Sequence, residues 1–251
     1  MKDVRPDYYV RLHAVEEQHW WHVGMREIAA ALLGRRLDGG HLSLLDAGCG
    51  TGGFLAWADE TGSFDRLCGV DISAEAVELA RQAVPSAELH VAAIDALPFD
   101  DASFDVAVLN DVLQHVEEDE VVPGLRELGR TLTPEGALLV RTNGGVHARR
   151  ERSDWRLYDT DTLCSALAGA GFRPVRVTHV NALLSLWSAA RGRGPTAPTP
   201  TTCGIPTQAG AAANAVGRGL LRLEASLLRH SGLSIPYGHT LLAVAVPGAR
   251  A

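Results

Sequence analysis

Short, continuous apolar runs alternate with amphipathic stretches along most of this chain. The apolar runs cover residues 42–46, 67–71, 88–93, 104–110, 137–142 and 174–180. Runs of this kind are typical of parallel strands that are buried on both faces. The stretches between them have the spacing of helices with one apolar face and cover residues 53–61, 73–83, 118–132 and 160–170. The alternation predicts an α/β fold, with helices on both faces of a mostly parallel sheet.

The first forty residues precede this alternation. Residues 6–37 predict two helices that are interrupted near residues 21–24, where a Trp-His-Val-Gly segment occurs. We expect residues 1–40 to form an N-terminal helical cap, and residues 41–251 to form the ligand-binding domain beside it.

The last third of the chain departs from the simple alternation. Helices predicted over residues 182–190 and 211–229 flank a Pro- and Thr-rich stretch at 192–210, and a closing strand follows at 239–246. Residues 181–238 are therefore predicted to be an insertion of helix and loop before the last strand. A loop this long is typical of a lid, an interface arm or a disordered segment, and the sequence leaves these three open.

A glycine-dense turn follows the first apolar run. The run ends at Asp46, and Gly48, Gly50 and Gly52 come directly after it. Glycine lets the backbone pass close under a ligand where any Cβ would collide. The second apolar run ends at Asp71, whose carboxylate can accept hydrogen bonds from both hydroxyls of a ribose. The combination predicts a nucleoside pocket at the carboxyl edge of the parallel sheet.

Asp46 narrows the choice of nucleoside. A carboxylate at the strand tip would repel the diphosphate of a dinucleotide, whereas it suits a cationic ligand. S-adenosyl-L-methionine has a ribose, an adenine, a sulfonium and an amino group, and it has no phosphate. The pattern therefore favours S-adenosyl-L-methionine over NAD(P), and a nicotinamide oxidoreductase is the weaker hypothesis.

The string from Asp46 to Gly52 resembles motif I of the class I S-adenosylmethionine-dependent methyltransferases, in their small-molecule branch. Further segments resemble motifs of the same superfamily, in order and spacing, at residues 69–73, 94–99, 103–108, 112–116 and 132–137. The resemblance implies a Rossmann-like sheet of seven strands with an antiparallel last strand. It also implies S-adenosyl-L-methionine as cofactor and S-adenosyl-L-homocysteine as product.

The resemblance assigns roles on the cofactor side. Asp71 and Ile72 belong to the acidic second motif, beside the ribose. Asp95 is expected to meet the exocyclic amine of adenine, and the N–H of Ala96 to meet a ring nitrogen. Asn110, at the tip of the fourth strand, is expected to contact the methionine amino group or the acceptor, or else to cap the next turn.

A His-Trp-Trp segment at residues 19–21, followed by Arg26, resembles a box found in a subset of bacterial relatives. Trp20 offers an indole face that can hold a sulfonium by cation–π attraction, and Arg26 can pair with the methionine carboxylate. The alternative is that the two tryptophans only anchor a helix on the sheet. Neighbours on a helix point about 100° apart, so at most one of them faces the cofactor.

Methyl transfer needs a base only if the acceptor arrives protonated. His115, just past the fourth strand, is the candidate catalytic base because its reference pKa suits proton transfer near neutrality. A structural hydrogen bond is the alternative role for this histidine. Side chains after the fifth strand that can line the acceptor pocket are Arg141, Asn143 and His147.

Charge and cysteine use bear on partners and location. A net charge of −7 argues against nucleic acid or an anionic membrane as the main partner. The cysteines show no metal-binding spacing, and Cys49 falls inside the ligand loop, which favours a reducing compartment. With no signal-peptide pattern and no apolar run of membrane-spanning length, the sequence predicts a cytoplasmic protein without a metal site. Monomer and homodimer are both left open.

The sequence therefore predicts methyl transfer from S-adenosyl-L-methionine to oxygen or nitrogen of a small-molecule acceptor, with a secondary metabolite as one class considered. The alternative is a protein of the same fold that binds the cofactor, or its demethylated product, and catalyses non-methyl chemistry such as a cyclisation. Sequence motifs do not separate the two hypotheses, since both proteins bind the same ligand.

Overall fold

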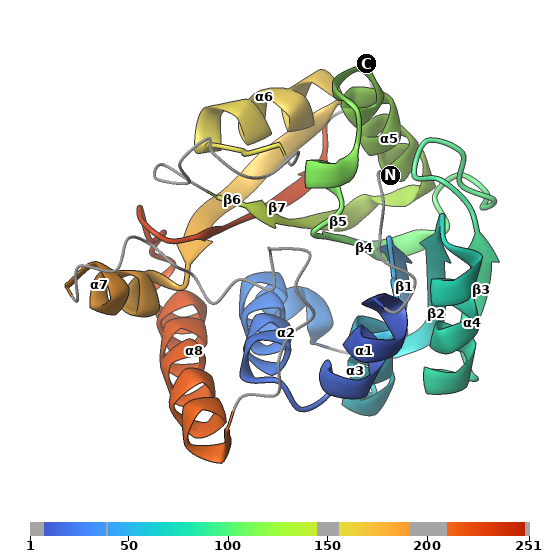
Figure 1. Cartoon of the computed structure of the whole chain (residues 1–251). Helices are drawn as coiled ribbons and strands as arrows, with labels where there is room; N and C mark the ends of the chain where they lie inside the picture. The colour runs from blue at the N-terminus through green and yellow to red at the C-terminus, as the bar shows by residue number, and fades with distance from the viewer. Residues whose placement is uncertain (1–7, 39, 145–155, 191–209, 249–251) are drawn as a thin grey trace.

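The fold is built on one sheet of seven strands. The computed structural model describes residues 8–38, 40–144, 156–190 and 210–248 (Figure 1). The strands lie in the order β3-β2-β1-β4-β5-β7-β6. Their bounds are Leu42–Ala47 (β1), Phe64–Asp71 (β2), Glu88–Val91 (β3), Phe104–Asn110 (β4), Leu132–Asn143 (β5), Phe172–Val180 (β6) and Thr240–Pro247 (β7). Strands β1 to β5 pair in parallel, and β7 runs antiparallel to both of its neighbours. The predicted sheet and its antiparallel last strand are confirmed.

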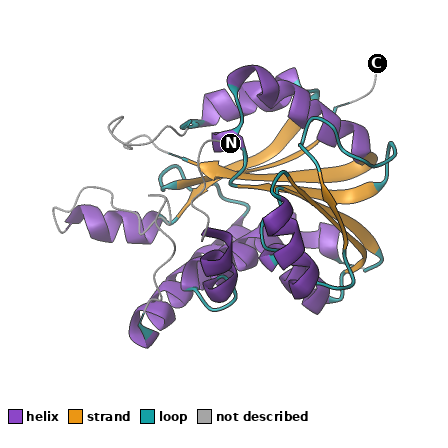
Figure 2. Ribbon diagram, turned by 45° about the vertical axis from the view of Figure 1, so that its right-hand side comes forward, coloured by secondary structure: helices purple, strands orange, loops and turns teal. Residues whose placement is uncertain are grey.

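Helices cover both faces of the sheet (Figures 1 and 2). Helices α5 (Glu118–Thr131) and α6 (Thr160–Gly169) pack on one face. The other face is covered by α2 (Trp20–Leu33), α3 (Gly53–Thr61), α4 (Ala74–Ala83) and α8 (Ala211–Ser231). The apolar side chains of each layer meet the sheet in a separate cluster, so the strands are buried from both sides, as their continuous apolar runs predicted.

The break between the first two helices lies earlier than predicted. Helix α1 covers Tyr8–Val15, and α2 begins at Trp20, so the interruption falls at residues 16–19 and not at 21–24. His19 is the N-cap of α2, and its Nδ1 accepts a hydrogen bond from the backbone N–H of Trp21 at 3.4 Å. A polar side chain at this position satisfies one of the free N–H groups of the first turn. Both tryptophans therefore lie inside the helix.

Strand β5 is longer than predicted. It takes in residues 132–136, ahead of the predicted strand at 137–142. Pairing with β4 begins at Phe104 and Leu132 and resumes at Val106 and Ala137, with an irregular register between them. The extra residues on β5 are accommodated in this irregularity. The strand thereby reaches back to the end of α5 while its apolar part keeps its place in the sheet.

The N-terminal helix α2 is part of the main core. Its buried residues share one apolar cluster with Leu44 of β1 and Leu139 of β5. Along its outer side α2 packs against α8, where Gly217 lies under the ring of Trp20 and Gly24 lies against Leu221. Segments predicted as an N-terminal cap and a C-terminal insertion thus form one layer, and the division of the chain at residue 40 stays a prediction.

Helix α8 also fixes the turn after β6. The buried carboxylate of Glu224 accepts hydrogen bonds from the backbone N–H groups of Asn181 (2.7 Å) and Leu183 (3.1 Å), at the start of α7 (Ala182–Ala190). The Pro- and Thr-rich stretch at 192–210 lies outside the described residues except for its last residue, so its predicted roles stay open. Within the part of the chain that the structure describes, no helix combines the length and apolar character needed to cross a bilayer.

Candidate active site

The carboxyl ends of β1, β2, β4 and β5 meet at one edge of the sheet, which we call the carboxyl edge. Parallel pairing brings Asp46 of β1 beside Val108 of β4, and Asn110 of β4 beside Arg141 of β5. Asp71 ends β2 at the same edge, one strand away from Asp46. Polar side chains predicted from separate motifs are therefore neighbours in space.

The glycine loop is held tightly against its surroundings. The N–H groups of Gly48 and Cys49 both donate to the carbonyl of Val70, at 2.7 and 2.9 Å. Gly48 has φ +85°, and a Cβ at this position would overlap the side chain of Val112. Gly52 has φ +87° and faces the backbone of Ala80 on α4. Any other residue at these two positions would strain the turn or push its neighbours away.

Asp71 braces the glycine loop from below. Its Oδ2 accepts a hydrogen bond from the N–H of Gly50 at 3.0 Å, and its Oδ1 accepts one from the N–H of Ser73 at 2.9 Å. Burial raises the pKa of this carboxyl, while the backbone donors oppose the shift. Each oxygen keeps a second lone pair, so the group can still accept hydrogen bonds from ribose hydroxyls. Tyr9 of α1 lies close by, against Ser73, and sequence reasoning did not identify it.

The predicted adenine side is open to solvent. Ile72 is 49% exposed next to Asp71, and Asp95 and Ala96 are exposed as well. The N–H of Ala96 donates to the carbonyl of Ala93 at 3.2 Å, within a turn. The exposed, apolar side chain of Ile72 lies next to Asp71, the carboxylate predicted to bind the ribose. It offers a surface on which a base can stack.

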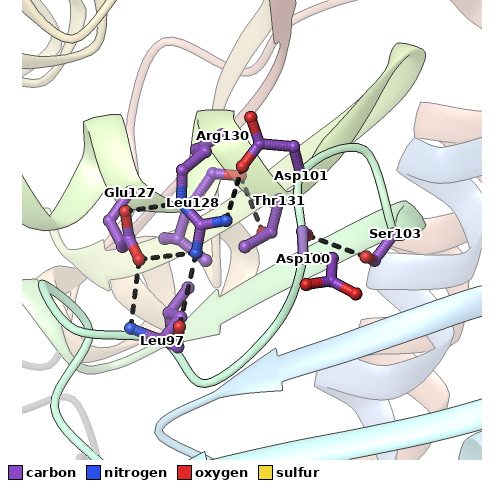
Figure 3. Close-up of polar contacts among 8 residues, drawn as sticks. All are labelled: Leu97, Asp100, Asp101, Ser103, Glu127, Leu128, Arg130 and Thr131. Atoms are coloured by element: carbon purple, nitrogen blue, oxygen red, sulfur yellow. Dashed lines mark hydrogen bonds and ion pairs between the residues drawn. The ribbon is translucent and has the colours of Figure 1, made fainter.

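A polar network anchors the loop that carries Asp95 and Ala96 to α5 (Figure 3). Arg130 donates to the carbonyl of Leu97 at 3.3 Å and to the carboxylate of Asp101 at 2.7 Å. Glu127 accepts from the N–H of Leu97 at 3.2 Å and from Arg130 at 2.7 Å. The Arg130 guanidinium holds the pKa of the Glu127 carboxyl below its usual range. The network therefore ties the loop to α5.

Two strand residues at the carboxyl edge each have a buried polar atom that finds no hydrogen-bond partner among the described residues. These atoms are Oδ1 of Asp46 and Nδ2 of Asn110. Burial raises the pKa of Asp46 to about 7, although Arg141 acts in the opposite direction. A buried polar group without a partner is unfavourable, so such atoms mark places where a ligand completes the hydrogen bonding. One acceptor and one donor side by side fit the ammonium and carboxylate of an amino acid.

Arg26 and Glu16 lie over the start of α3. The hydroxyl of Thr51, in the glycine loop, donates to Oε1 of Glu16 at 2.5 Å, and Arg26 donates to the carbonyl of Glu16 at 3.3 Å. A Cβ on Gly53 would overlap both the Glu16 carboxylate and the Arg26 guanidinium. Burial raises the pKa of Glu16 and lowers that of Arg26. Sequence reasoning did not identify Glu16, which precedes the His-Trp-Trp segment and lies between two helices.

The two tryptophans of α2 face different partners. Trp20 packs on Gly217 of α8, and its backbone N–H donates to Oδ1 of Asn214 at 3.0 Å. The ring of Trp21 lies under the guanidinium of Arg141, with the central carbon of that group 4.8 Å from the ring centroid. Trp20 was predicted to contact the sulfonium, but in the structure it packs against α8. Trp21 is the tryptophan that lies at the carboxyl edge.

Comparison with known proteins adds evidence of a different kind. The family model for the methyltransferase domain matches residues 45–140. A malonyl-[acyl-carrier protein] O-methyltransferase of Serratia marcescens is 27% identical over 184 residues, which cover 68% of this chain and 71% of the relative. Residues 45–140 thus match a methyltransferase domain, which confirms the predicted resemblance to the class I S-adenosylmethionine-dependent methyltransferases. Across the curated relatives that it matches, the matched segments span from 29% to 71% of their own lengths, and about half in most.

Several solved structures are similar to this chain over most of its length. The [4+2]-cyclase SpnF superposes with a TM-score of 0.64 at 18% identity, covering 96% of this chain and 92% of that one. A geranyl diphosphate C-methyltransferase from Streptomyces coelicolor A3(2) has a TM-score of 0.56 at 16% identity, with coverage of 87% and 78%. At these identities the likeness shows the fold and does not decide between transferase and cyclase chemistry.

The residues at the carboxyl edge of this chain fit S-adenosyl-L-methionine, the cofactor that the resemblance implies. The space that a Cβ on Gly50 would fill is open, and Asp71 offers lone pairs to a ribose. The unpaired atoms of Asp46 and Asn110 suit the amino-acid end. Among the described residues, no group of three or more His, Cys, Asp or Glu side chains is arranged to hold a metal ion.

On the predicted acceptor side of the site, Asp111 and Arg141 form an ion pair. Nε and Nη2 of Arg141 both donate to Oδ2 of Asp111, at 3.0 and 2.7 Å. Asp111 has φ +58°, and its own N–H donates to the Arg141 carbonyl at 2.9 Å. His115 lies nearby in a 3₁₀ turn (Leu113–His115) and is exposed, and burial of part of its ring lowers its pKa. His147, also predicted for the acceptor pocket, lies outside the described residues.

Proposed function

We propose that this protein transfers the methyl group of S-adenosyl-L-methionine to an oxygen or nitrogen atom of a small-molecule acceptor. The observation that carries the proposal is the unpaired, buried carboxylate oxygen of Asp46 beside a glycine loop that Asp71 braces. A pocket with these groups favours a ligand that combines a ribose with a positive charge. Bound S-adenosyl-L-methionine supplies a methyl group already activated for displacement.

The chain's own residues hold and orient the cofactor in this proposal. Asp71 and Ile72 hold the ribose and one face of the base, and Asp95 with Ala96 closes the adenine side. Asp46 and Asn110 bind the amino-acid end, while Arg26 lies within reach of its carboxylate.

Tyr9 of α1 and Glu16, which lies between α1 and α2, cover the loop: Tyr9 contacts Ser73, next to the loop, and Glu16 contacts Thr51 within it. Positioning and exclusion of water supply much of the rate of such a displacement.

The acceptor side supports a polar acceptor. Arg141 and Asp111 present a charged pair at the ends of β4 and β5, next to the exposed His115. Polar and ionisable groups of this kind suit an acceptor oxygen or nitrogen whose proton must be moved. The relatives are named as O- and C-methyltransferases. We place the acceptor among small molecules because the net charge of −7 disfavours nucleic acid.

Calorimetric titration is the first test. We expect the protein to bind S-adenosyl-L-methionine and S-adenosyl-L-homocysteine and not NAD. Asp71→Ala should weaken binding by roughly 1.5–3 kcal/mol, the scale of charge-assisted hydrogen bonds. Asp65→Ala, at an exposed position of the same strand, is the matched control. Equal affinity in a folded Asp71→Ala variant would remove this residue from the site.

The reaction itself is tested by mass spectrometry of acceptor panels incubated with the cofactor. A product heavier by one CH₂, together with S-adenosyl-L-homocysteine, supports the transferase. A product with an unchanged formula, formed without consumption of the cofactor, supports the cyclase alternative instead. Binding of NAD alone would contradict both.

A further inference from the structure

A second histidine lies at the carboxyl edge, deeper than His115. His22 is the third residue of α2, and its ring meets the ring of Trp21 edge-on, with centroids 5.0 Å apart. Trp21 in turn lies under Arg141, which is bonded to Asp111. His22 is therefore joined through two contacts to the ends of β4 and β5, where the acceptor is proposed to bind.

The Nε2 atom of His22 is buried and has no hydrogen-bond partner within the described part of the chain. A structural histidine in a core normally uses its ring nitrogens to satisfy neighbouring polar groups. An imidazole nitrogen that is buried and unpaired at a ligand-binding edge is instead available to a bound molecule. This distinguishes His22 from His19, whose Nδ1 caps the helix.

The charges around His22 favour its neutral form. The guanidiniums that act on it are those of Arg141 from β5 and Arg26 from α2, and His19 adds to their effect. Burial together with these groups holds the pKa of His22 well below its usual range. Arg141 donates to the carboxylate of Asp111, and Arg26 donates to the backbone carbonyl of Glu16. A base must be unprotonated before reaction, and these neighbours keep His22 in that form near neutrality.

Resting on the proposed function, we propose that His22 is the general base of the reaction and that its Nε2 takes the proton of the acceptor. The acceptor O–H or N–H bond breaks as its proton passes to Nε2. The freed electron pair forms the bond to the methyl carbon, and the carbon–sulfur bond breaks with its electron pair leaving on sulfur. The positive charge of the sulfonium is thereby lost while the imidazole gains one. Repulsion from Arg141 and Arg26 then favours release of that proton to water.

The first test needs no acceptor. Two-bond ¹H–¹⁵N correlation spectra of ¹⁵N-histidine-labelled protein, bound to S-adenosyl-L-homocysteine, report which ring nitrogen carries a proton. His22 is assigned by the signal that is missing in His22→Gln. We expect Nε2 to be unprotonated from about pH 8 down to about pH 6, below which an ordinary histidine is charged. A protonated Nε2 at neutral pH would overturn the inference, since such an atom cannot accept a proton.

The second test uses the acceptor found by mass spectrometry. His22→Gln and His22→Asn keep a polar side chain but no base, so turnover should fall by about 100-fold or more. Affinity for S-adenosyl-L-homocysteine should stay within about threefold of the wild-type value. In the pH profile of turnover, the acidic limb that reports protonation of His22 should disappear. His90→Gln, at the far edge of the sheet where His90 contacts Glu88, is the control and should behave as wild type.

Turnover preserved in both His22 variants, with a large loss in His115→Gln, would assign the proton transfer to His115 and reject His22. A protein that binds S-adenosyl-L-homocysteine but methylates no acceptor counts against the proposed function. In that case the proton state of Nε2 still decides the inference about His22.

Discussion

The hydroxyl of Thr51 donates a hydrogen bond to the carboxylate of Glu16, and the 2.5 Å contact joins the N-terminal helices to the glycine loop. Both side chains are buried, and Arg26 is bonded to the backbone of the same glutamate. The glycine loop, which we propose as the floor of the cofactor pocket, is thus fixed from above by a residue 35 positions earlier in the chain.

Glu16→Ala should destabilise the protein because it leaves the buried Thr51 hydroxyl without its acceptor and removes a carboxylate charge close to Arg26. Loss of one such partner costs about 1–3 kcal/mol. Urea denaturation measures the free energy of unfolding. Glu16→Gln keeps an acceptor for the hydroxyl and should lose less than Glu16→Ala. An alanine variant as stable as wild type would show that the contact does not hold the loop.

Cofactor affinity should depend on pH through Asp46. Burial raises the pKa of this carboxyl to about 7, so the ligand-free folded protein binds a proton that the unfolded chain releases above its ordinary pKa. Stability contributed by this group therefore falls as pH rises between about 4 and 7 and is level above. A cationic ligand needs the ionised form, so its affinity should rise by at most about tenfold per unit of pH up to about 7.

Calorimetry at several pH values checks this expectation, with Asp46→Asn as the comparison. The variant cannot ionise at this position, so the difference in affinity between wild type and variant isolates the effect from titration of the ligand's own amino group. Parallel pH profiles for the two proteins would remove Asp46 from contact with the cationic end.

Arg130→Ala should weaken cofactor binding although Arg130 lies on α5. Its guanidinium bonds Leu97, Glu127 and Asp101 and so fixes the loop that carries Asp95 (Figure 3). A loop that must be ordered on binding lowers affinity, and we expect a loss of about 0.5–1.5 kcal/mol, several-fold in Kd. Arg81→Ala removes an exposed ion pair with Glu78 on α4 and should leave affinity unchanged. Equal affinities in both variants would show that the loop is ordered without the network.

Gly217→Ala should destabilise the packing of α8 on α2. A Cβ at Gly217 would lie 2.5 Å from the ring of Trp20, and overpacking of this kind costs about 1–3 kcal/mol. Gly219→Ala, on the open side of the same helix, should instead stabilise by about 0.5–1 kcal/mol because alanine is the better helix former. The opposite signs, measured by thermal or urea unfolding, identify the contact with Trp20 as the cause. Stabilisation in both variants would contradict the close packing.

The fold and the floor of the pocket could be predicted because their signals are local. Continuous apolar runs gave the strands, and glycines followed by an acid gave the loop and Asp71. Predicted helix boundaries were wrong where a capping residue was not recognised. His19 caps α2, so the helix begins before the interruption that was predicted near residues 21–24.

The roof of the pocket could not be predicted in the same way. Trp21 contacts Arg141, and Glu16 contacts Thr51, across long separations in sequence, and no local sequence pattern encodes such contacts. Which of the two tryptophans faces the carboxyl edge depends on the rotation of α2, and that rotation is set by its packing on α8. The buried Nε2 of His22 follows from the same rotation.

The contact of Gly24 with Leu221 and of Gly217 with Trp20 has a consequence for the order in which the chain acquires its structure. During translation α2 is synthesised long before α8. Strands β1 to β6 are synthesised in between, before α8 can pack on the outer side of α2. Contacts so far apart in sequence form slowly. During that interval the indole of Trp20 stays accessible, and a nascent chain halted before α8 should be recognisable by its exposed tryptophan.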